Sequence, residues 1–172
     1  MEASHPLAPG QQVGPYEILS QIGQGGMGVV YKALDTRLGR HVALKCLSHH
    51  FSGDQSAKDG FLLEARAASL LNHPNICTVY DIGETEQGQL FIAMAYYEGE
   101  TLAQHIGCGP LPLADALNII IQLTNGIGAA HAQNIYHRDI KPANILVTPD
   151  WQVRILDFGV AKIADAHLPQ LT

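Results

Sequence analysis

The sequence predicts an α+β fold in two parts: a mostly antiparallel sheet with one helix, then further helices and a small hairpin. Up to about residue 97, short segments alternate apolar and polar side chains with a period of two, which is typical of strands. After Gly99 the apolar residues recur every three or four positions, which indicates helices. We therefore place the junction between the two parts around residues 97–99.

The first part begins with three alternating segments that are bounded by turn residues. Their expected ranges are Tyr16–Ile22, Val29–Ala33 and His41–Leu47. Glycines separate the first pair and residues 35–39 separate the second pair, so these strands should form an antiparallel meander. Residues 1–14 contain Gly and Pro breakers without periodicity, and we expect them to form a flexible tail.

Helical periodicity follows over Ser56–Leu71, and His73-Pro74 ends this helix. Two more strands are expected near residues 78–83 and 89–94, and a short helix over residues 101–106. A hairpin with strands over residues 145–148 and 151–156 should close the second part. Before it lies a long helix, about residues 113–133, with a stripe formed by Leu113, Leu117, Ile120, Thr124 and Ile127.

Composition argues against several classes of function. The formal net charge of -6 argues against a nucleic-acid-binding surface, so we expect no nucleic-acid partner. The cysteines Cys46, Cys77 and Cys108 are scattered, which favours reduced thiols over disulfides or a zinc site. No segment has the pattern of a signal peptide or reaches the roughly 18 apolar residues of a membrane span. We expect a cytoplasmic chain without a membrane segment, and the sequence indicates no particular oligomeric state.

Glycines 23, 25, 26 and 28 lie between the first two predicted strands, in the segment GQGGMGVVY over residues 23–31. Such glycines let the backbone approach a phosphate chain and direct N–H groups toward it. An ordinary strand–turn–strand connection would contain the same glycines, so the segment alone leaves both interpretations open. It is not a dinucleotide-binding fingerprint, because a strand rather than a helix follows Gly28.

Lys45 lies in the middle of an apolar strand, on the same face as Ala43. A buried lysine is costly unless an anionic group pairs with it. Glu64, in the predicted helix that follows, is a candidate partner that would hold the lysine for the phosphates of a nucleotide. The alternatives are a lysine that points to water and a solvated glutamate that pairs with Lys58 or Arg66.

The strongest chemical signal is the segment HRDIKPAN over residues 137–144, which is followed by Asp157-Phe158-Gly159. It contains a proton acceptor, a cation that can face a phosphate, and oxygen ligands for magnesium, which are the groups that phosphoryl transfer requires. Each residue alone would fit an ordinary loop. Their combination behind the glycine segment and Lys45 indicates phosphoryl transfer.

Together these segments resemble the protein kinase superfamily over about residues 16–162. The glycine segment, His73–Ile76 and Asp157–Lys162 are most similar to the bacterial serine/threonine branch, and Lys141-Pro142 is the serine/threonine form of the catalytic loop. The resemblance implies a protein-kinase-like fold. We expect a complete N-terminal lobe over residues 15–97 and only the first part of the helical C-terminal lobe over residues 98–172.

The resemblance also implies roles for individual residues. Asp139 would accept the proton of the substrate hydroxyl, Lys141 would steady the γ-phosphate of ATP, and Asn144 and Asp157 would hold Mg²⁺. Arg138 would engage a phosphorylated activation loop. The residues expected to bind ATP are Ile22, Gly23, Gly25, Gly28, Val30, Ala43, Lys45, Glu64, Met94, Tyr96 and Leu146.

The function that these residues favour is a serine/threonine protein kinase that transfers the γ-phosphate of ATP to a protein hydroxyl. Only 13 residues follow Gly159, without the later helices of the family, so this chain alone is expected to be weakly active or inactive. Three alternatives remain open. They are an ATP-binding, pseudokinase-like fragment that transfers nothing, a small-molecule phosphotransferase of the same fold, and a truncated product without independent function.

Overall fold

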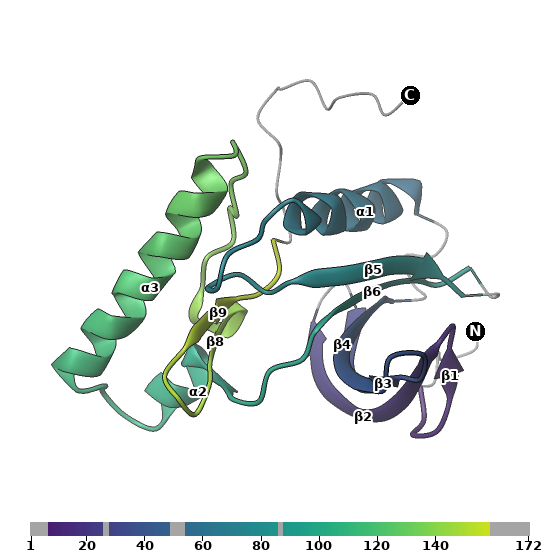
Figure 1. Ribbon diagram of the computed structural model, residues 1–172, viewed down its shortest axis with the longest axis horizontal. Helices are drawn as coiled ribbons and strands as arrows, with labels where there is room; N and C mark the ends of the chain where they lie inside the picture. The colour runs from purple at the N-terminus through teal and green to yellow at the C-terminus, as the bar shows by residue number, and fades with distance from the viewer. Residues whose placement is uncertain (1–6, 26–27, 49–53, 86–87, 159–172) are drawn as a thin grey trace. The chain divides into compact units, whose positions relative to one another are not determined.

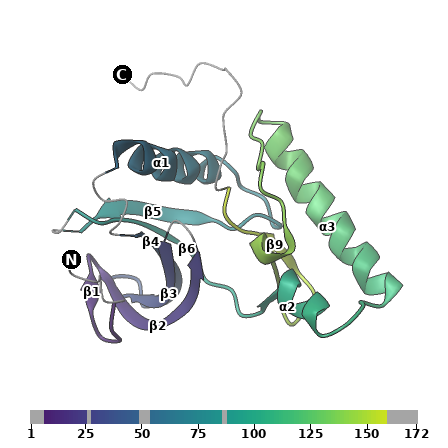
Figure 2. The ribbon, with the colours of Figure 1, turned by 180° about the vertical axis from the view of Figure 1, so that it is seen from behind.

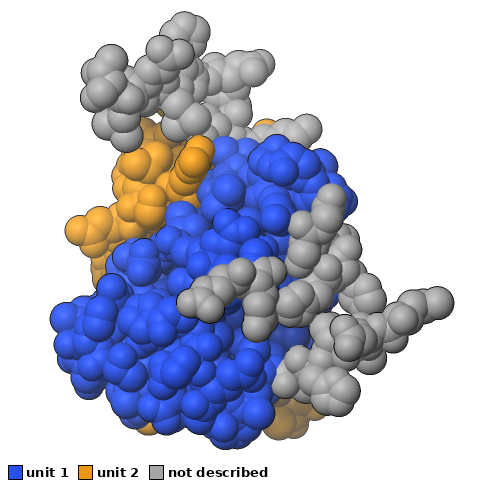
Figure 3. Space-filling view, turned by 90° about the vertical axis from the view of Figure 1, so that its right-hand side faces the viewer, with its two compact units in different colours: residues 1–65, 78–97 blue, residues 66–77, 98–172 orange. Residues whose placement is uncertain are grey.

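The computed structural model describes residues 7–25, 28–48, 54–85 and 88–158, and it divides the chain into two compact units (Figure 3). Unit 1 comprises residues 1–65 and 78–97, and unit 2 comprises residues 66–77 and 98–172. The described strands of each unit form one sheet.

Unit 1 is built on a six-stranded antiparallel sheet with the strand order β1-β2-β3-β4-β6-β5 (Figure 1). One helix, α1 (Gln55–Ser69), follows β4, and its last turn is counted with unit 2. The predicted meander is confirmed, with strand ends that differ by a few residues. The strands are β1 Gln12–Val13, β2 Tyr16–Gly25, β3 Gly28–Asp35, β4 Arg40–Leu47, β5 Val79–Glu84 and β6 Leu90–Ala95.

Strands β2, β3 and β4 curve strongly (Figures 1 and 2), and one face of this sheet forms a hydrophobic core. Because side chains alternate between the two faces of a strand, the core residues Val42 and Leu44 place Ala43 and Lys45 on the opposite face. The core residues are Val13, Tyr16, Ile18, Tyr31, Ala33, Val42, Leu44, Cys46, Phe91 and Ala93.

The flexible tail predicted over residues 1–14 is wrong for its second half. Gln12 and Val13 form β1 against β2, and Val13 is only 2% exposed. The backbone N–H of Leu7 donates to the Tyr31 hydroxyl at 3.0 Å. Burial of Leu7 and Val13 against the core therefore orders this segment, whereas residues 1–6 lie outside the described residues.

The described residues of unit 2 form a three-stranded sheet with the order β7-β8-β9, the helices α2 and α3, and a short 3₁₀ turn, η2. Helix α2 begins with a capping box. The backbone N–H of Gln104 donates to the Thr101 side chain, and the backbone N–H of Thr101 donates to the Gln104 side chain. The elements are β7 Glu100–Thr101, α2 Leu102–Gly107, α3 Leu113–His131, η2 Pro142–Asn144, β8 Ile145–Val147 and β9 Val153–Ile155.

Helix α3 lies beside β8 and β9 (Figures 1 and 2), and its buried residues are Ile119, Gly126 and Ala130. A Cβ atom at Gly126 would lie 2.7 Å from Cδ1 of Ile155, so a larger residue there would require the Ile155 side chain to move. The bulky residues of the stripe noted in the sequence lie on another face: Leu113, Leu117 and Ile120 are 74%, 50% and 53% exposed. Among the described residues, no helix combines the length and apolar character that a membrane span requires.

Candidate active site

The predicted site residues fall into two groups, one in each unit, and the structure describes all of them. The group in unit 2 consists of Asp139, Lys141, Asn144, Leu146 and Asp157. The group in unit 1 consists of Ile22, Gly23, Gly25, Gly28, Val30, Ala43, Lys45, Glu64, Met94 and Tyr96.

Strand register brings four of the unit 1 residues together on the sheet face opposite the core. Val30 on β3 pairs with Lys45 on β4, and Ala43 on β4 pairs with Met94 on β6. Directly paired residues have Cβ atoms about 4.5–5.5 Å apart. The result is a continuous surface on which Lys45 lies beside small and apolar side chains. Such a surface suits a ligand that has an apolar ring and a charged substituent.

The central charged group of this face is the ion pair between Lys45 and Glu64, whose Nζ and Oε1 atoms are 2.8 Å apart. Both residues are buried, with 7% and 5% exposure. Because β4 is an interior strand, Lys45 does not point to water, and Lys58 instead lies 3.9 Å from Glu84. The predicted pair is confirmed, whereas its role toward a nucleotide stays a prediction.

The predicted glycines differ in what their surroundings require. A Cβ atom at Gly28 would overlap the carbonyl oxygen of Cys46, so glycine is needed there for β3 to approach β4. A Cβ atom at Gly25 would have no described atom within 4 Å, so there is open space for a ligand beside this glycine. At Gly23 the nearest contact, with Val30, is an ordinary 3.8 Å. Residues 26 and 27 at the tip lie outside the described residues.

The remaining nucleotide-binding candidates lie in β2, in β8 and directly after β6. Ile22 occupies an irregularity between the paired residues of β2 and β3 and is 48% exposed. Tyr96 directly follows β6 and is half-buried. Leu146 lies in β8 of unit 2, paired with Arg154, and is also partly exposed.

Asp139 is the centre of the polar group in unit 2. Its Oδ2 accepts hydrogen bonds from Nζ of Lys141 at 2.7 Å and from Nδ2 of Asn144 at 3.1 Å. The hydrogen bond from Lys141 is the main cause that lowers the pKa of Asp139, so the carboxyl group is ionised at neutral pH. An ionised carboxylate at 42% side-chain exposure can accept a proton from a bound hydroxyl.

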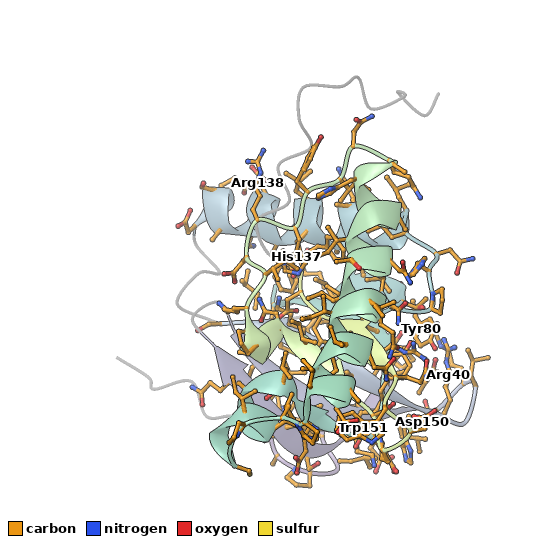
Figure 4. All side chains as sticks on the ribbon, turned by 90° about the vertical axis from the view of Figure 1, so that its left-hand side faces the viewer. Arg40, Tyr80, His137, Arg138, Asp150 and Trp151 are labelled. Atoms are coloured by element: carbon orange, nitrogen blue, oxygen red, sulfur yellow. The ribbon has the colours of Figure 1, made fainter. Side chains whose placement is uncertain are left out.

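His137 connects the catalytic loop to the segment before Asp157. Its Nδ1 accepts the backbone N–H of Asp139 at 3.3 Å, so its Nε2 carries the proton and donates to the carbonyl of Leu156 at 2.8 Å. Its ring lies 4.7 Å from that of Phe158, and burial lowers its pKa. Figure 4 shows that His137 points inward and Arg138 outward.

Two residues of these motifs have left-handed backbone conformations that non-glycine residues rarely adopt. Arg138 has φ 61° and Asp157 has φ 45°. Such conformations persist where the surrounding structure enforces them, and they concentrate at functional sites. Here His137 is hydrogen-bonded to the backbone of Asp139, which follows Arg138, and to the backbone of Leu156, which precedes Asp157.

The donor set of unit 2 fits Mg²⁺. The Nδ2 of Asn144 donates to the backbone carbonyl of Asp139 at 2.9 Å, so its amide oxygen is the atom that can bind a cation. The backbone N–H of Leu156 donates to the carbonyl of Asn144 at 2.8 Å, which ties Asn144 to the segment that leads to Asp157. One amide and one carboxylate oxygen suit Mg²⁺, which usually takes few protein ligands beside water and phosphate. Within the described ranges, no group of three or more His, Cys, Asp or Glu residues could hold a metal ion.

Asn75 is a supporting residue that sequence reasoning missed. It is 6% exposed, and its Nδ2 donates to Gln122 of α3 and to the carbonyl of Val153 in β9 at 3.0 and 3.1 Å. The backbone N–H of Ile155 donates to the Asn75 carbonyl at 2.8 Å. The chain before Asp157 is therefore held in place by a residue that the sequence marks as part of the His73–Ile76 segment, without indicating these partners.

The sequence model of the protein kinase domain matches residues 16–170 of this chain. Serine/threonine-protein kinase PknA of Mycobacterium tuberculosis is 42% identical over 158 residues, 89% of this chain and 37% of PknA. PrkC of Bacillus subtilis is 46% identical over 149 residues, 86% of this chain and 23% of PrkC. The chain thus spans less than two fifths of the length of these relatives.

Solved structures show the same likeness in three dimensions. The crystal structure of the Mycobacterium tuberculosis PknI kinase domain matches with a TM-score of 0.79 and 33% identity, over 91% of this chain and 63% of that chain. The PpkA-294 apo form matches with a TM-score of 0.81 and 27% identity, over 91% of this chain and 63% of that chain. These matches confirm the predicted fold class.

Proposed function

This chain belongs to the protein kinase family, and from that premise we propose that it transfers the γ-phosphate of ATP, with Mg²⁺, to a serine or threonine hydroxyl of a protein. The observation that carries the proposal is the group around Asp139, an ionised carboxylate bonded to Lys141 and Asn144. Relatives named serine/threonine-protein kinases support the choice of the acceptor.

We assign nucleotide binding chiefly to unit 1. The adenine ring packs against Val30, Ala43 and Met94, and the phosphates are bound by Lys45, which Glu64 orients. The shared sheet face and the 2.8 Å ion pair support this assignment. The open space around Gly25 supports an approach of the phosphates to the glycine segment.

We assign the chemical step to unit 2. The carboxylate of Asp139 accepts the proton of the substrate hydroxyl while the hydroxyl oxygen forms a bond to the γ-phosphorus of ATP. The bond between the γ-phosphorus and the β–γ bridging oxygen breaks, which releases ADP. Lys141, which is bonded to Asp139 in this structure, steadies the γ-phosphate. When bound at Asn144 and Asp157, Mg²⁺ neutralises charge on the phosphates.

Domain organisation and location follow from the same assignment. We propose an N-terminal lobe over residues 15–97 and part of a C-terminal lobe over residues 98–172. The partner is a protein that presents a serine or threonine hydroxyl. We place the kinase domain in the cytoplasm, where ATP is available, and the free thiols of Cys46, Cys77 and Cys108 suit that reducing compartment.

The first test is a thermal-shift titration with Mg-ATP. A ligand that binds only the folded state raises the melting midpoint with concentration. We expect such a rise in the parent chain, its loss in Lys45→Met, and its retention in Lys58→Met, a matched change of a lysine outside the site. Asp157→Ala should lose the magnesium-dependent part of the rise. No rise at millimolar Mg-ATP in a folded parent would overturn the proposed site.

The second test measures transfer of labelled phosphate from ATP to a generic basic protein. It uses this chain and a chimera completed with the remaining part of the PknI kinase domain, because the chain spans 63% of that domain. We expect transfer by the chimera, and its loss in Asp139→Asn with Mg-ATP binding retained. Mg-ATP binding without transfer in either protein would favour the pseudokinase-like alternative. Transfer by Asp139→Asn within a few-fold of the parent would contradict the assigned role of Asp139.

A further inference from the structure

The sheet face that carries the proposed nucleotide site continues beyond Ala43 and Met94 toward the residues after β6. Lys32 lies two positions after Val30 on β3, so it shares this face and pairs directly with Ala43. His41 lies two positions before Ala43 on β4 and shares the face for the same reason. Lys32 is partly buried and His41 is exposed.

Both residues contact Tyr96, the first residue after β6. The Nζ of Lys32 lies 4.5 Å from the centroid of the Tyr96 ring, which is the geometry of a cation–π interaction. The His41 ring meets the same ring edge-on, with centroids 6.3 Å apart and an interplanar angle of 80°. The small side chain of Ala43, between Lys32 and Met94 in the register, leaves room for the lysine stem to extend toward Tyr96.

We propose that Lys32, through its contact with the Tyr96 ring, is a positioning residue that sets the affinity of the site for the adenosine part of its nucleotide. The paired register of β6 ends at Ala95, so side-chain contacts help to fix the direction of Tyr96. Lys32 lies on β3 and Tyr96 directly follows β6, two strands that do not pair with each other, so their contact ties the segment after β6 to β3. The inference rests on the proposed function, because it assumes that a nucleotide binds this face.

The size of the effect follows from the type of contact. A cation–π interaction at a partly exposed site contributes about 0.5–1 kcal/mol, which corresponds to about a two- to fivefold change in Kd. Loss of the contact should weaken the binding of adenosine, Mg-ADP and Mg-ATP by the same factor, because the segment it positions lies away from Lys45. A direct contact of Lys32 with phosphate would instead weaken Mg-ATP binding more than adenosine binding.

The test measures Kd by titration of the chain with adenosine, Mg-ADP and Mg-ATP. We expect Lys32→Met and Tyr96→Leu each to raise all three Kd values two- to fivefold, with no further rise in the double variant. Lys32→Arg keeps a cation over the Tyr96 ring, so we expect it to stay within twofold of the parent. Lys58→Met is the matched control for the loss of a lysine on the same unit. The melting midpoint of each variant without ligand establishes that it is folded at the titration temperature.

Three results would overturn the inference. They are parent-like binding in Lys32→Met, multiplicative effects in the double variant, and loss of affinity in Lys32→Arg. The two proposals fail in different ways. If the parent binds Mg-ATP and Lys45→Met does not, but Lys32→Met binds like the parent, the inference fails and the proposed function stands. If the folded parent binds none of the three ligands, both fail.

Discussion

Replacing Glu64 with leucine tests whether the buried ion pair serves folding, nucleotide binding or both. Lys45 and Glu64 are 7% and 5% exposed, and their charged atoms are 2.8 Å apart. Removing one partner of a buried pair costs on the order of 3–5 kcal/mol, because the other charge loses that ion pair in a poorly solvated place. Replacing both partners with apolar residues of similar volume is often neutral.

We therefore expect Glu64→Leu to lower the free energy of unfolding by about 3–5 kcal/mol, which is a large part of a typical total of about 5–15 kcal/mol. For a chain of this size the melting midpoint should fall by roughly 6–20 °C. The double variant Lys45→Met/Glu64→Leu should recover most of this loss. It should not recover Mg-ATP binding, because the lysine that is proposed to bind the phosphates is absent.

Urea denaturation gives the free energies, and the thermal-shift titration gives binding for the same samples. Glu84→Leu is the matched control, because its pair with Lys58 is longer, at 3.9 Å, and its side chain is 52% exposed. A surface pair of this kind contributes less than about 1 kcal/mol. The reasoning would be refuted if Glu64→Leu stayed within about 1 kcal/mol of the parent, or if the double variant were as unstable as the two single losses added together.

Three further predictions concern stability. Gly28→Ala should lower the free energy of unfolding by about 1–3 kcal/mol in urea without any ligand, because its Cβ would overlap the Cys46 carbonyl; a parent-like value would contradict this packing. Burial lowers the pKa of His137, so the unfolded state takes up its proton first and stability should fall as pH drops below about 6.5. His137→Asn should reduce the dependence of the free energy of unfolding on pH in this range, and an unchanged dependence would contradict the assignment to His137. Burial, assisted by the hydrogen bond to Asp81, raises the pKa of Tyr16 to about 12. The stability that protonated Tyr16 contributes should be present below about pH 10 and be lost as the pH rises toward 12. Melting midpoints measured at several pH values would detect this loss, and Tyr16→Phe should lose less stability at alkaline pH.

The strands of unit 1 were predictable because alternation in a half-buried sheet is a local signal. In β4, Val42 and Leu44 face the core while Ala43 and Lys45 face the other side, and the sequence shows this directly. Strand β1 was missed because its two residues are too few to show a period. Its partners Tyr16 and Glu17 are close in sequence, but Val13 is buried in a core that also contains Tyr31 and Phe91, and no local pattern records that burial.

Helix α3 shows a second limit of hydrophobic patterns. The sequence identifies the bulky stripe that includes Leu117 and Ile120, yet these side chains are exposed. The face that packs within unit 2 contains Ile119, Gly126 and Ala130. Small residues such as Gly126 give a weak apolar signal, although they let α3 lie close to Ile155, and Ile119 supplies the one bulky buried side chain of this face among the described residues.

Part of the candidate site was predictable for a physical reason. A lysine in an apolar strand requires a partner, and that requirement indicates Glu64 from the sequence alone. The contact between Lys32 and Tyr96 was not predictable, because it depends on the register across three strands. The same holds for Asn75, whose partners lie on α3 and β9.

The two units separate stability from chemistry to different degrees. In unit 1 the alternation of β4 places the core on one face and the candidate site on the other, so most substitutions should affect one property. In unit 2 the polar residues of the loop do both. Asn144, which is proposed to bind Mg²⁺ through its amide oxygen, also holds Asp139 through its amide nitrogen, and His137 holds the backbone at Asp139 and Leu156. Changes in this loop should therefore alter stability and the proposed transfer together, so Asp139→Asn, which keeps the shape of the side chain, is a better probe of the chemistry than a truncation to alanine.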